Sequence, residues 1–403
     1  MSTLMQEGLA QEIEQRVSSA RALMVDRGLD ALLVYGNNKV NGALHYMSGY
    51  FPDRGGWLAN GPTRADIAIF DAATLFVPLA GEPVLVFDKG QLLDREAVTS
   101  ITTVNGFGGE LASQPAVPVY VADLLRSAGA TGRVGVETWD KFPTPFYLGL
   151  ATELPGTEFL QSTVVEDLML VKSDWEVANF RQCAAVGDLG HRAFMEAMRR
   201  GPGQTELELI RAAEAVMRNA DPVYEEVNPG SPSLISSGKI GRLAMLHNPM
   251  GSKTVEVGDI VNWDLASRHR GYPIDTSRTR MLGKATPEQK RANAVAIEMR
   301  DEIIAAIRPG VQVQDLVSIA DKIATAGGVE FYDRFIGHGL GLDVHQRPDM
   351  GMEEMQLRAN MMITVEPRII LDGQWLMGNE DMVLVTESGA DVLTTTPVDE
   401  LEL

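Results

Sequence analysis

Five side chains that can bind metal ions occur in the second half of the sequence, each in an apolar or glycine-rich segment. They are Asp264 in VNWDLA, Asp275 in YPIDTSRT, His338 in GHGLG, Glu366 in TVEPR and Glu380 in GNEDMVLV. Carboxylates are seldom buried unless they are paired or bound to a cation. Four carboxylates and one imidazole suit divalent ions such as Mn, Co, Fe or Zn. We therefore expect these residues to hold two divalent metal ions, about 3.5–4 Å apart.

The two aspartates are expected to lie on one β-hairpin. They are 275 − 264 = 11 residues apart, and residues 267–271 between them are typical of a turn. That spacing places both carboxylates near each other on one face of the hairpin. Either aspartate alone could be a turn or cap residue. Two carboxylates this close cannot both ionise cheaply without a cation, so the pair favours a functional site.

Two histidines, His338 and His345, share the segment GHGLGLDVHQRP. They are seven residues apart (345 − 338 = 7). Glycines on both sides of His338 would let the backbone pass close to a ligand. A lone histidine more often makes structural hydrogen bonds, and the pair shifts the interpretation toward a site. Glu366 ends one apolar segment and Glu380 begins another. Each glutamate alone could be a charged strand end.

The elements that must position these residues form two domains. The first, residues 1–165, alternates helices and strands, which predicts an α/β domain. A capping box, Ser173 with Glu176, predicts a long helix at the start of the second domain, residues 166–403. Helices are predicted at 8–28 and 119–129, and strands at 30–36, 65–70, 83–87, 100–104 and 133–137.

A weak internal repeat divides the second domain. Residues 199–217 resemble residues 306–324, with an offset of 309 − 202 = 107 residues, and a Pro-Gly pair precedes a helical pattern in each copy. A Pro-Gly pair is also a common turn sequence before helices, so the similarity could arise without a repeat. Two similar halves would place a site at their interface, where ligands from both can converge.

The composition excludes several functional classes. The net charge is −20, and an acidic surface argues against nucleic acid or an anionic membrane as partner. The single cysteine, Cys183, excludes an internal disulfide framework and favours a reducing compartment. No signal-peptide core or membrane-spanning apolar run is found, so we expect a cytoplasmic protein.

The motifs NWDLA, YPIDTSRT, GHGLGLDVH, TVEP and NEDMVLVTESG, in this order, resemble the pita-bread metallohydrolases: methionine aminopeptidase, aminopeptidase P, prolidase and creatinase. The segment RVSSARALMVDRGLDALLVYGNNKVNGALHYMSGY is similar to the N-terminal domain of the prolidase, aminopeptidase P and creatinase branch. The resemblance implies an α/β (α+β) chain. A smaller N-terminal α/β creatinase-like domain would precede a C-terminal pita-bread domain with pseudo-twofold halves.

The resemblance also implies residue roles. The five residues named above match the family's metal ligands, with Asp275 and Glu380 bridging both ions, and Glu366 also matches a proton shuttle. His345 matches a histidine that contacts the substrate or the developing oxyanion. His247, in RLAMLHNPMG, matches a histidine that lines the pocket.

Four positions depart from the family pattern: Gly378, Arg368, Ala266 in place of a glycine, and Gln346 in place of an acidic residue. Prolidases and aminopeptidases P usually carry an arginine two residues before the last ligand, and this chain has Gly378. The glycine that usually follows the Glu-Pro pair is Arg368. Without the arginine usual at position 378, the site lacks a charged group that would orient the peptide substrate, which puts ordinary proline-dipeptide hydrolysis in doubt. Arg368 would either supply a positive charge from a new direction or be a solvated strand end.

A glycine- and aromatic-rich stretch at residues 45–57 includes Arg54 and Trp57. In this branch the N-terminal domain often reaches into the partner subunit's site, so the stretch could cap a pocket in a homodimer. The alternative is a loop that packs against the core.

These observations predict a dinuclear metallohydrolase, similar to Xaa-Pro peptidases, that cleaves an amide or peptide C–N bond of a small molecule or short peptide. A hydroxide bridging two metals would attack the carbonyl carbon. The first alternative keeps the fold and changes the reaction, to a small-molecule amidohydrolase or an enzyme like dimethylsulfoniopropionate lyase. The second is a non-catalytic interaction module.

Overall fold

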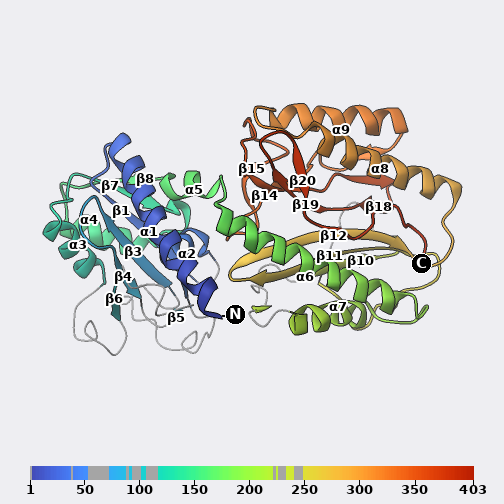
Figure 1. Ribbon diagram of the computed structural model, residues 1–403, viewed down its shortest axis with the longest axis horizontal. Helices are drawn as coiled ribbons and strands as arrows, with labels where there is room; N and C mark the ends of the chain where they lie inside the picture. Colours follow the sequence, from blue (N-terminus) through green and yellow to red (C-terminus); the bar gives the residue numbers. More distant parts are fainter. Residues whose placement is uncertain are drawn as a thin grey trace. The chain divides into compact units, whose positions relative to one another are not determined.

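Apolar strands and amphipathic helices build two units, Met1–Met169 and Leu170–Leu403 (Figure 1). The structure, a computed structural model, describes residues 2–37, 40–52, 72–87, 90–92, 101–105, 117–220, 224–225, 233–239 and 248–403. The boundary expected after residue 165 falls inside helix α5 (Val164–Met169). This helix belongs to the first unit, where Asp167 pairs with Arg27 at 2.6 Å.

The first unit is built on a six-stranded sheet in the order β6-β4-β3-β1-β7-β8. Strand β1 is parallel to β7 and antiparallel to β3. Its apolar run is buried on both faces, as expected for a strand covered by helices. The strands are β1 (Ala31–Asn37), β3 (Ala72–Pro78), β4 (Val84–Phe87), β6 (Thr102–Asn105), β7 (Arg133–Glu137) and β8 (Glu158–Gln161). The small strands β2 (Tyr50–Pro52) and β5 (Gly90–Leu92) pair separately.

Two helices of this unit overlap the helices predicted at 8–28 and 119–129. Helix α1 (Ser2–Asp26) buries Ile13, Ala20 and Met24, and the chain leaves it through Gly28, whose φ of 63° suits glycine. The other helices are α2 (Gly42–Ser48), α3 (Val117–Ser127), the 3₁₀ turn η1 (Trp139–Lys141) and α4 (Thr144–Glu153). The strand predicted at 65–70 lies outside the described residues.

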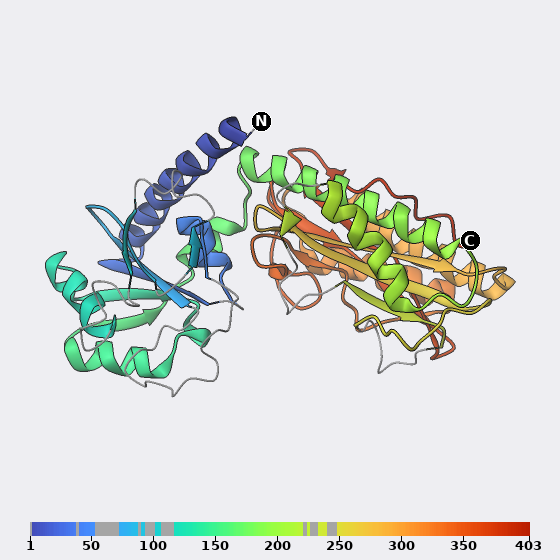
Figure 2. The same ribbon diagram turned by 90° about the horizontal axis from the view of Figure 1, so that it is seen from below.

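The second unit repeats a pair of helices. Helix α6 (Asp174–Met198) is followed by α7 (Glu206–Ala220), and α8 (Pro287–Ala306) by α9 (Val313–Gly327). Helices α7 and α9 begin 313 − 206 = 107 residues apart, the offset of the sequence repeat. The predicted Ser173–Glu176 capping box is present at the start of α6. Helices α6 and α7 cover one side of the strands, and α8 and α9 cover the other (Figures 1 and 2).

Three sheets lie between these helices. The first contains β9 (Tyr224–Glu225), β10 (Leu234–Ser237), β11 (Ile260–His269) and β12 (Tyr272–Met281). The second contains β13 (Glu330–Phe331), β17 (Arg368–Leu371) and β18 (Trp375–Gly378). The third contains β14 (His338–Gly339), β15 (Gln346–Asp349), β16 (Met362–Val365), β19 (Asp381–Val385) and β20 (Ala390–Val392).

Strands β11 and β12 form the predicted hairpin with a tighter turn than residues 267–271. Residues 267–269 continue β11, and only Arg270 and Gly271 form the turn, with φ values of 53° and 84°. Positive φ at both positions gives the turn a twist that matches that of the two strands. The strands can therefore stay paired from the pair of Ile260 and Met281 to the pair of His269 and Tyr272. No helix among the described residues is long and apolar enough to span a membrane.

Candidate metal centre

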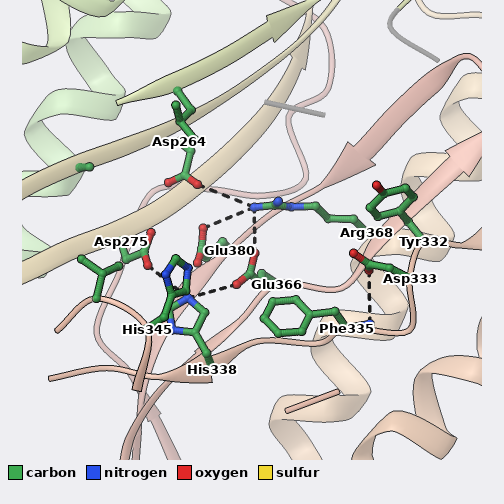
Figure 3. A pocket seen from close by; sticks show the side chains of 13 residues that line it. Asp264, Asp275, Tyr332, Asp333, Phe335, His338, His345, Glu366, Arg368 and Glu380 are labelled. Atoms are coloured by element: carbon green, nitrogen blue, oxygen red, sulfur yellow. Dashed lines mark hydrogen bonds and ion pairs between the residues drawn. The ribbon is translucent and has the colours of Figure 1, made fainter. Parts of the chain in front are cut away.

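A cavity of about 360 Å³ in the second unit contains all five of the predicted metal-binding side chains (Figure 3). Asp264 and Asp275 come from the first sheet, and the other three come from strands that follow α9 in the chain. The two halves of the repeat therefore both contribute to one site, as expected for an interface between similar halves.

The hairpin register brings the two aspartates together. Asp275 pairs with Ala266, and Asp264 pairs with Ser277. The aspartates are consequently diagonal neighbours on one face of the hairpin, within reach of a shared ligand.

Strand ends position the other three side chains. His338 is the first residue of β14, Glu366 follows β16 and Glu380 precedes β19. Val365 pairs with Asp381, so the two glutamates leave adjacent antiparallel strands side by side. The backbone N–H of Glu380 donates to the carbonyl of Ser277 at 2.9 Å and links this sheet to β12.

The glycines around His338 serve backbone packing. A Cβ at Gly337 would lie 2.1 Å from the carbonyl oxygen of Thr364, and one at Gly339 would lie 2.0 Å from that of Arg347. The expectation that these glycines make room for a ligand is therefore corrected, because the neighbours that need the space are backbone atoms of this chain.

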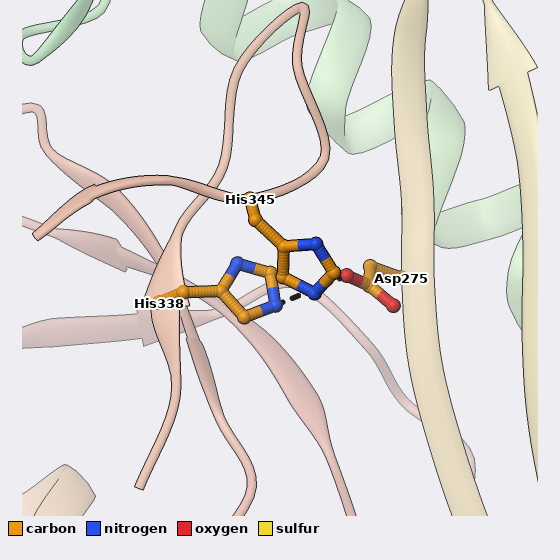
Figure 4. A group of neighbouring side chains, drawn as sticks. All are labelled: Asp275, His338 and His345. Carbon is orange, nitrogen blue, oxygen red and sulfur yellow. Dashed lines mark ion pairs between the residues drawn. The ribbon is translucent and has the colours of Figure 1, made fainter. Parts of the chain in front are cut away.

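The imidazole of His338 faces two carboxylates through one nitrogen. Its Nε2 lies 3.2 Å from Asp275 Oδ2 (Figure 4). The same nitrogen lies 3.4 Å from Glu366 Oε1 (Figure 3). Its Nδ1 lies 3.1 Å from the carbonyl oxygen of Gly339. An Nδ1–H that donates to this carbonyl leaves a lone pair on Nε2, the tautomer that ligates metals. A proton or a metal ion on Nε2 would then offset the two carboxylates.

The acidic cluster shifts the pKa values of the groups within it. Burial, and then the charge of Asp275, hold the pKa of Asp264 and of Glu380 well above their ordinary values. Burial alone would lower the pKa of His338, but its hydrogen bond to Asp275 and the nearby carboxylates raise this pKa to about 9. Burial, and then the charge of His338, lower the pKa of His345, whose ring centroid lies 4.3 Å from that of His338.

The donor set fits divalent cations. Asp264 Oδ1 and Glu380 Oε2 are buried and have no hydrogen-bond partner among the described residues, which is costly unless a cation binds them. Ligand atoms of Asp264, Asp275 and Glu380 lie within 4.8 Å of one another, and so do those of His338, Glu366 and Glu380. Glu380 belongs to both groups, so the residues fit two neighbouring ions that share a ligand.

Comparison with known families places this centre among metallopeptidases. Residues 178–387, just over half of the chain, match the model of metallopeptidase family M24. The chain belongs to metallopeptidase family M24. Residues 16–169 match the Creatinase/Prolidase N-terminal domain. The predicted branch and the predicted order of domains, creatinase-like and then pita-bread, are thus confirmed.

Individual relatives of this M24 chain align along nearly its whole length. The Xaa-Pro dipeptidase of Pyrococcus horikoshii is 25% identical over 387 residues, which cover 95% of this chain and 98% of that protein. The structure of an Xaa-Pro dipeptidase from Bacillus anthracis has a TM-score of 0.77 and 20% identity, and covers 97% of this chain and 100% of that one. A prolidase from Thermococcus sibiricus has a TM-score of 0.78 and 21% identity, with 97% and 99% covered. The two structures show a shared fold.

In this M24 chain Arg368 points into the metal centre. Its Nη2 lies 2.8 Å from Glu366 Oε2, and 3.8 Å from Asp264 Oδ2 and from Glu380 Oε2. The interpretation of Arg368 as a solvated strand end is wrong, because its side chain is only 13% exposed. It supplies a positive charge from the strand that faces Gly378, its register partner.

Sequence reasoning missed one wall of the cavity. Tyr332, Asp333 and Phe335 line it beside Arg368. Asp333 and Arg334 have φ values of 46° and 58°, left-handed conformations that are rare outside glycine. The aromatic and acidic run FYDRF was the available signal. The predicted pocket residues His247, Arg54 and Trp57 lie outside the described residues.

Proposed function

We propose that the chain is a metal-dependent peptidase similar to Xaa-Pro dipeptidases, which hydrolyses the C–N bond of a short peptide or small amide. One observation carries the proposal: four carboxylates and a histidine meet in one cavity, and two of the buried carboxylate oxygens find no hydrogen-bond donor in the part of the chain that the structure describes. The names of the relatives, Xaa-Pro dipeptidases, support the class of substrate.

Asp264, Asp275, His338, Glu366 and Glu380 would hold the two ions. Divalent ions bound there would lower the pKa of a water molecule and polarise the scissile carbonyl. The protein's own contribution is to fix the ligands on strands of two sheets and to hold His338 in one tautomer through the Gly339 carbonyl.

Glu366 is the proposed proton relay. One of its oxygens, Oε1, faces His338, and the other, Oε2, faces the cavity side where Arg368 lies. A carboxylate in this position can accept a proton from the attacking water and deliver it to the leaving nitrogen.

His345 is the proposed oxyanion donor. It lines the cavity next to His338, and its lowered pKa favours a neutral imidazole at neutral pH. A neutral imidazole can donate an N–H to the oxygen that gains charge as the carbonyl carbon becomes tetrahedral.

Metal analysis combined with peptide assays tests this function. We expect the purified protein to contain a divalent metal and to hydrolyse Xaa-Pro dipeptides or tripeptides. Chelation and Asp275→Ala should each abolish turnover, because Asp275 belongs to the group with Asp264 and Glu380 and also lies 3.2 Å from His338. Full activity of the chelated protein and of the variant would sink the proposal.

A second candidate keeps the site and changes the reaction. The position of Arg368 favours it, because a guanidinium in the cavity opposite Gly378 presents the substrate with a positive charge from another direction than the arginine usual at position 378. The enzyme would then act on a small amide, or eliminate a leaving group from a sulfonium compound. Screening both classes beside Xaa-Pro peptides decides, and efficient Xaa-Pro turnover would count against this candidate.

A further inference from the structure

The guanidinium of Arg368 already acts as a cation inside the acidic cluster. Its Nη2 is within 2.8 to 3.8 Å of one oxygen each of Glu366, Asp264 and Glu380. Figure 3 shows these three carboxylates pointing toward it. They are three of the four carboxylates that would hold metal ions, so the same oxygens would serve two kinds of cation.

The side chain reaches this place because residue 378 is a glycine. Arg368 and Gly378 are partners across strands β17 and β18. A Cβ at position 378 would lie 2.8 Å from Cγ of Arg368 and 3.2 Å from its Cα. The contact with Cγ is closer than real Cβ atoms come, the contact with Cα is tight, and the Pro367 carbonyl oxygen would lie 2.9 Å away. A larger residue at 378 would therefore displace the Arg368 side chain or the backbone beside it.

Placing a guanidinium and a metal ion beside the same carboxylate oxygens costs free energy, because the two cations repel each other. Zn²⁺, for example, binds carboxylate oxygens at about 2.0–2.2 Å. An ion bound to Asp264 and Glu380 would therefore face the guanidinium at short range in a buried cavity, where like charges repel strongly. Glu366 separates the guanidinium from His338, because its Oε2 contacts Arg368 and its Oε1 contacts His338. His338 and its neighbour Asp275 therefore lie on the side of the cluster away from the guanidinium.

We propose that Arg368 competes with one of the two metal ions for the carboxylates of Asp264, Glu366 and Glu380. The ion held by His338 binds first, and the ion at Asp264 binds only when the guanidinium leaves Glu366. The two ions consequently bind with unequal affinity. This inference rests on the metal dependence of the proposed function and concerns how the centre is filled.

Calorimetric titration of the metal-free protein with Mn²⁺ tests the competition without an activity assay. We expect the wild-type chain to bind a first equivalent tightly and a second at least about tenfold more weakly. In Arg368→Gln the second equivalent should bind at least about tenfold more tightly than in the wild type, because a neutral amide replaces the guanidinium. Gly378→Ala should shift it in the same direction by displacing the arginine.

The matched control is Arg347→Gln. Arg347, on strand β15, forms an ion pair with Glu353 at 2.5 Å. It is not among the residues that line the cavity. Its loss should leave both affinities unchanged, and circular dichroism should report a folded protein for all variants. Equal second-site affinity in wild type and Arg368→Gln would overturn the inference alone. Absence of Mn²⁺ binding in both would overturn it together with the proposed function.

Discussion

At the scale of single residues, Glu366 has two neighbours of opposite character. Its Oε1 faces the imidazole of His338, and its Oε2 faces the guanidinium of Arg368. His338 and Glu366 could bind one metal ion together. The contact with Arg368 makes Glu366 Oε2 less able to accept a proton. The chemistry at this centre therefore depends on whether Arg368 stays on Glu366 when ions and substrate are bound.

Replacing His345 separates catalysis from metal binding. We expect His345→Ala to lower kcat by about 10²–10³, the usual effect of losing one donor to a developing oxyanion. Metal content, measured by mass spectrometry, should stay at the wild-type level, because the five predicted ligands remain. A variant that loses its metal in parallel with its activity would show that His345 is itself a ligand, as its proximity to Asp275 and His338 also permits.

At the scale of elements, a buried ion network joins β12, which carries Asp275, to β19, which begins directly after Glu380. Arg278 on β12 lies 2.7 Å from Asp381 on β19, and Arg300 on α8 lies 2.5 Å from the same carboxylate. Arg278 also donates to the carbonyl of Glu380 at 2.6 Å. The network thus fixes the start of β19, and with it the position of Glu380, relative to the hairpin.

Breaking this network should be costly. We expect Arg278→Met to lower the free energy of unfolding by about 3–5 kcal/mol, since it removes one partner of a fully buried pair. Urea denaturation measures the loss. The control is Arg291→Met, which removes an exposed pair with Glu288 at 3.8 Å and should change stability little. Similar values for the two variants would contradict a structural role for the buried network.

Lys172, just before α6, predicts a pH dependence. Burial lowers its pKa from 10.5 to about 8, against the opposing charge of Glu176. Between these two pH values the unfolded chain binds the proton that the folded chain has lost. The contribution of Lys172 to stability must therefore rise as the pH rises from about 8 to 10.5.

The difference in unfolding free energy between the wild type and Lys172→Met isolates this contribution. We expect that difference to change in favour of the wild type between pH 8 and pH 10, and to level off above 10.5. Chemical denaturation at each pH measures it. A difference that stays constant over this range would show that Lys172 keeps its proton in the folded chain.

At the scale of the whole molecule, metal ions should stabilise the fold. Burial and mutual repulsion raise the pKa of Asp264 and Glu380, so the metal-free cluster opposes folding at neutral pH. An ion present at one hundred times its Kd adds about 2.7 kcal/mol. We expect thermal unfolding to shift upward on addition of Mn²⁺ and to return after chelation. In Asp275→Ala the shift should be much smaller, and an equal shift would place the ion elsewhere.

The resemblance to the prolidase branch also predicts a homodimer. Light scattering after gel filtration should then give twice the 43.8 kDa mass of the chain. If residues 45–57 complete the partner's pocket, Trp57→Ala should raise KM with little effect on metal content. A monomer that retains full activity would exclude this arrangement.

Much of the centre was predictable because its signals are local. The hairpin of Asp264 and Asp275 follows from alternation on two strands and a short turn. Glu366 and Glu380 were expected at strand ends, where the structure has them. The capping box at Ser173 required only neighbouring residues. In each case, contacts within a few residues or across one hairpin decide the geometry.

The environment of Arg368 depended on tertiary structure. The Asp-Gly pair at 372–373 favours a hairpin, but a two-residue turn would pair Arg368 with Met377. In the structure Gln374 also belongs to the loop, and this extra residue pairs Arg368 with Gly378. The direction of the arginine toward Asp264 could not be read from spacing, since Asp264 lies on another sheet. The sequence by itself determined the five donors and their strands. Packing of the two halves decided that the donors share one cavity with a guanidinium, because contacts between distant segments form only when the sheets and helices close around them.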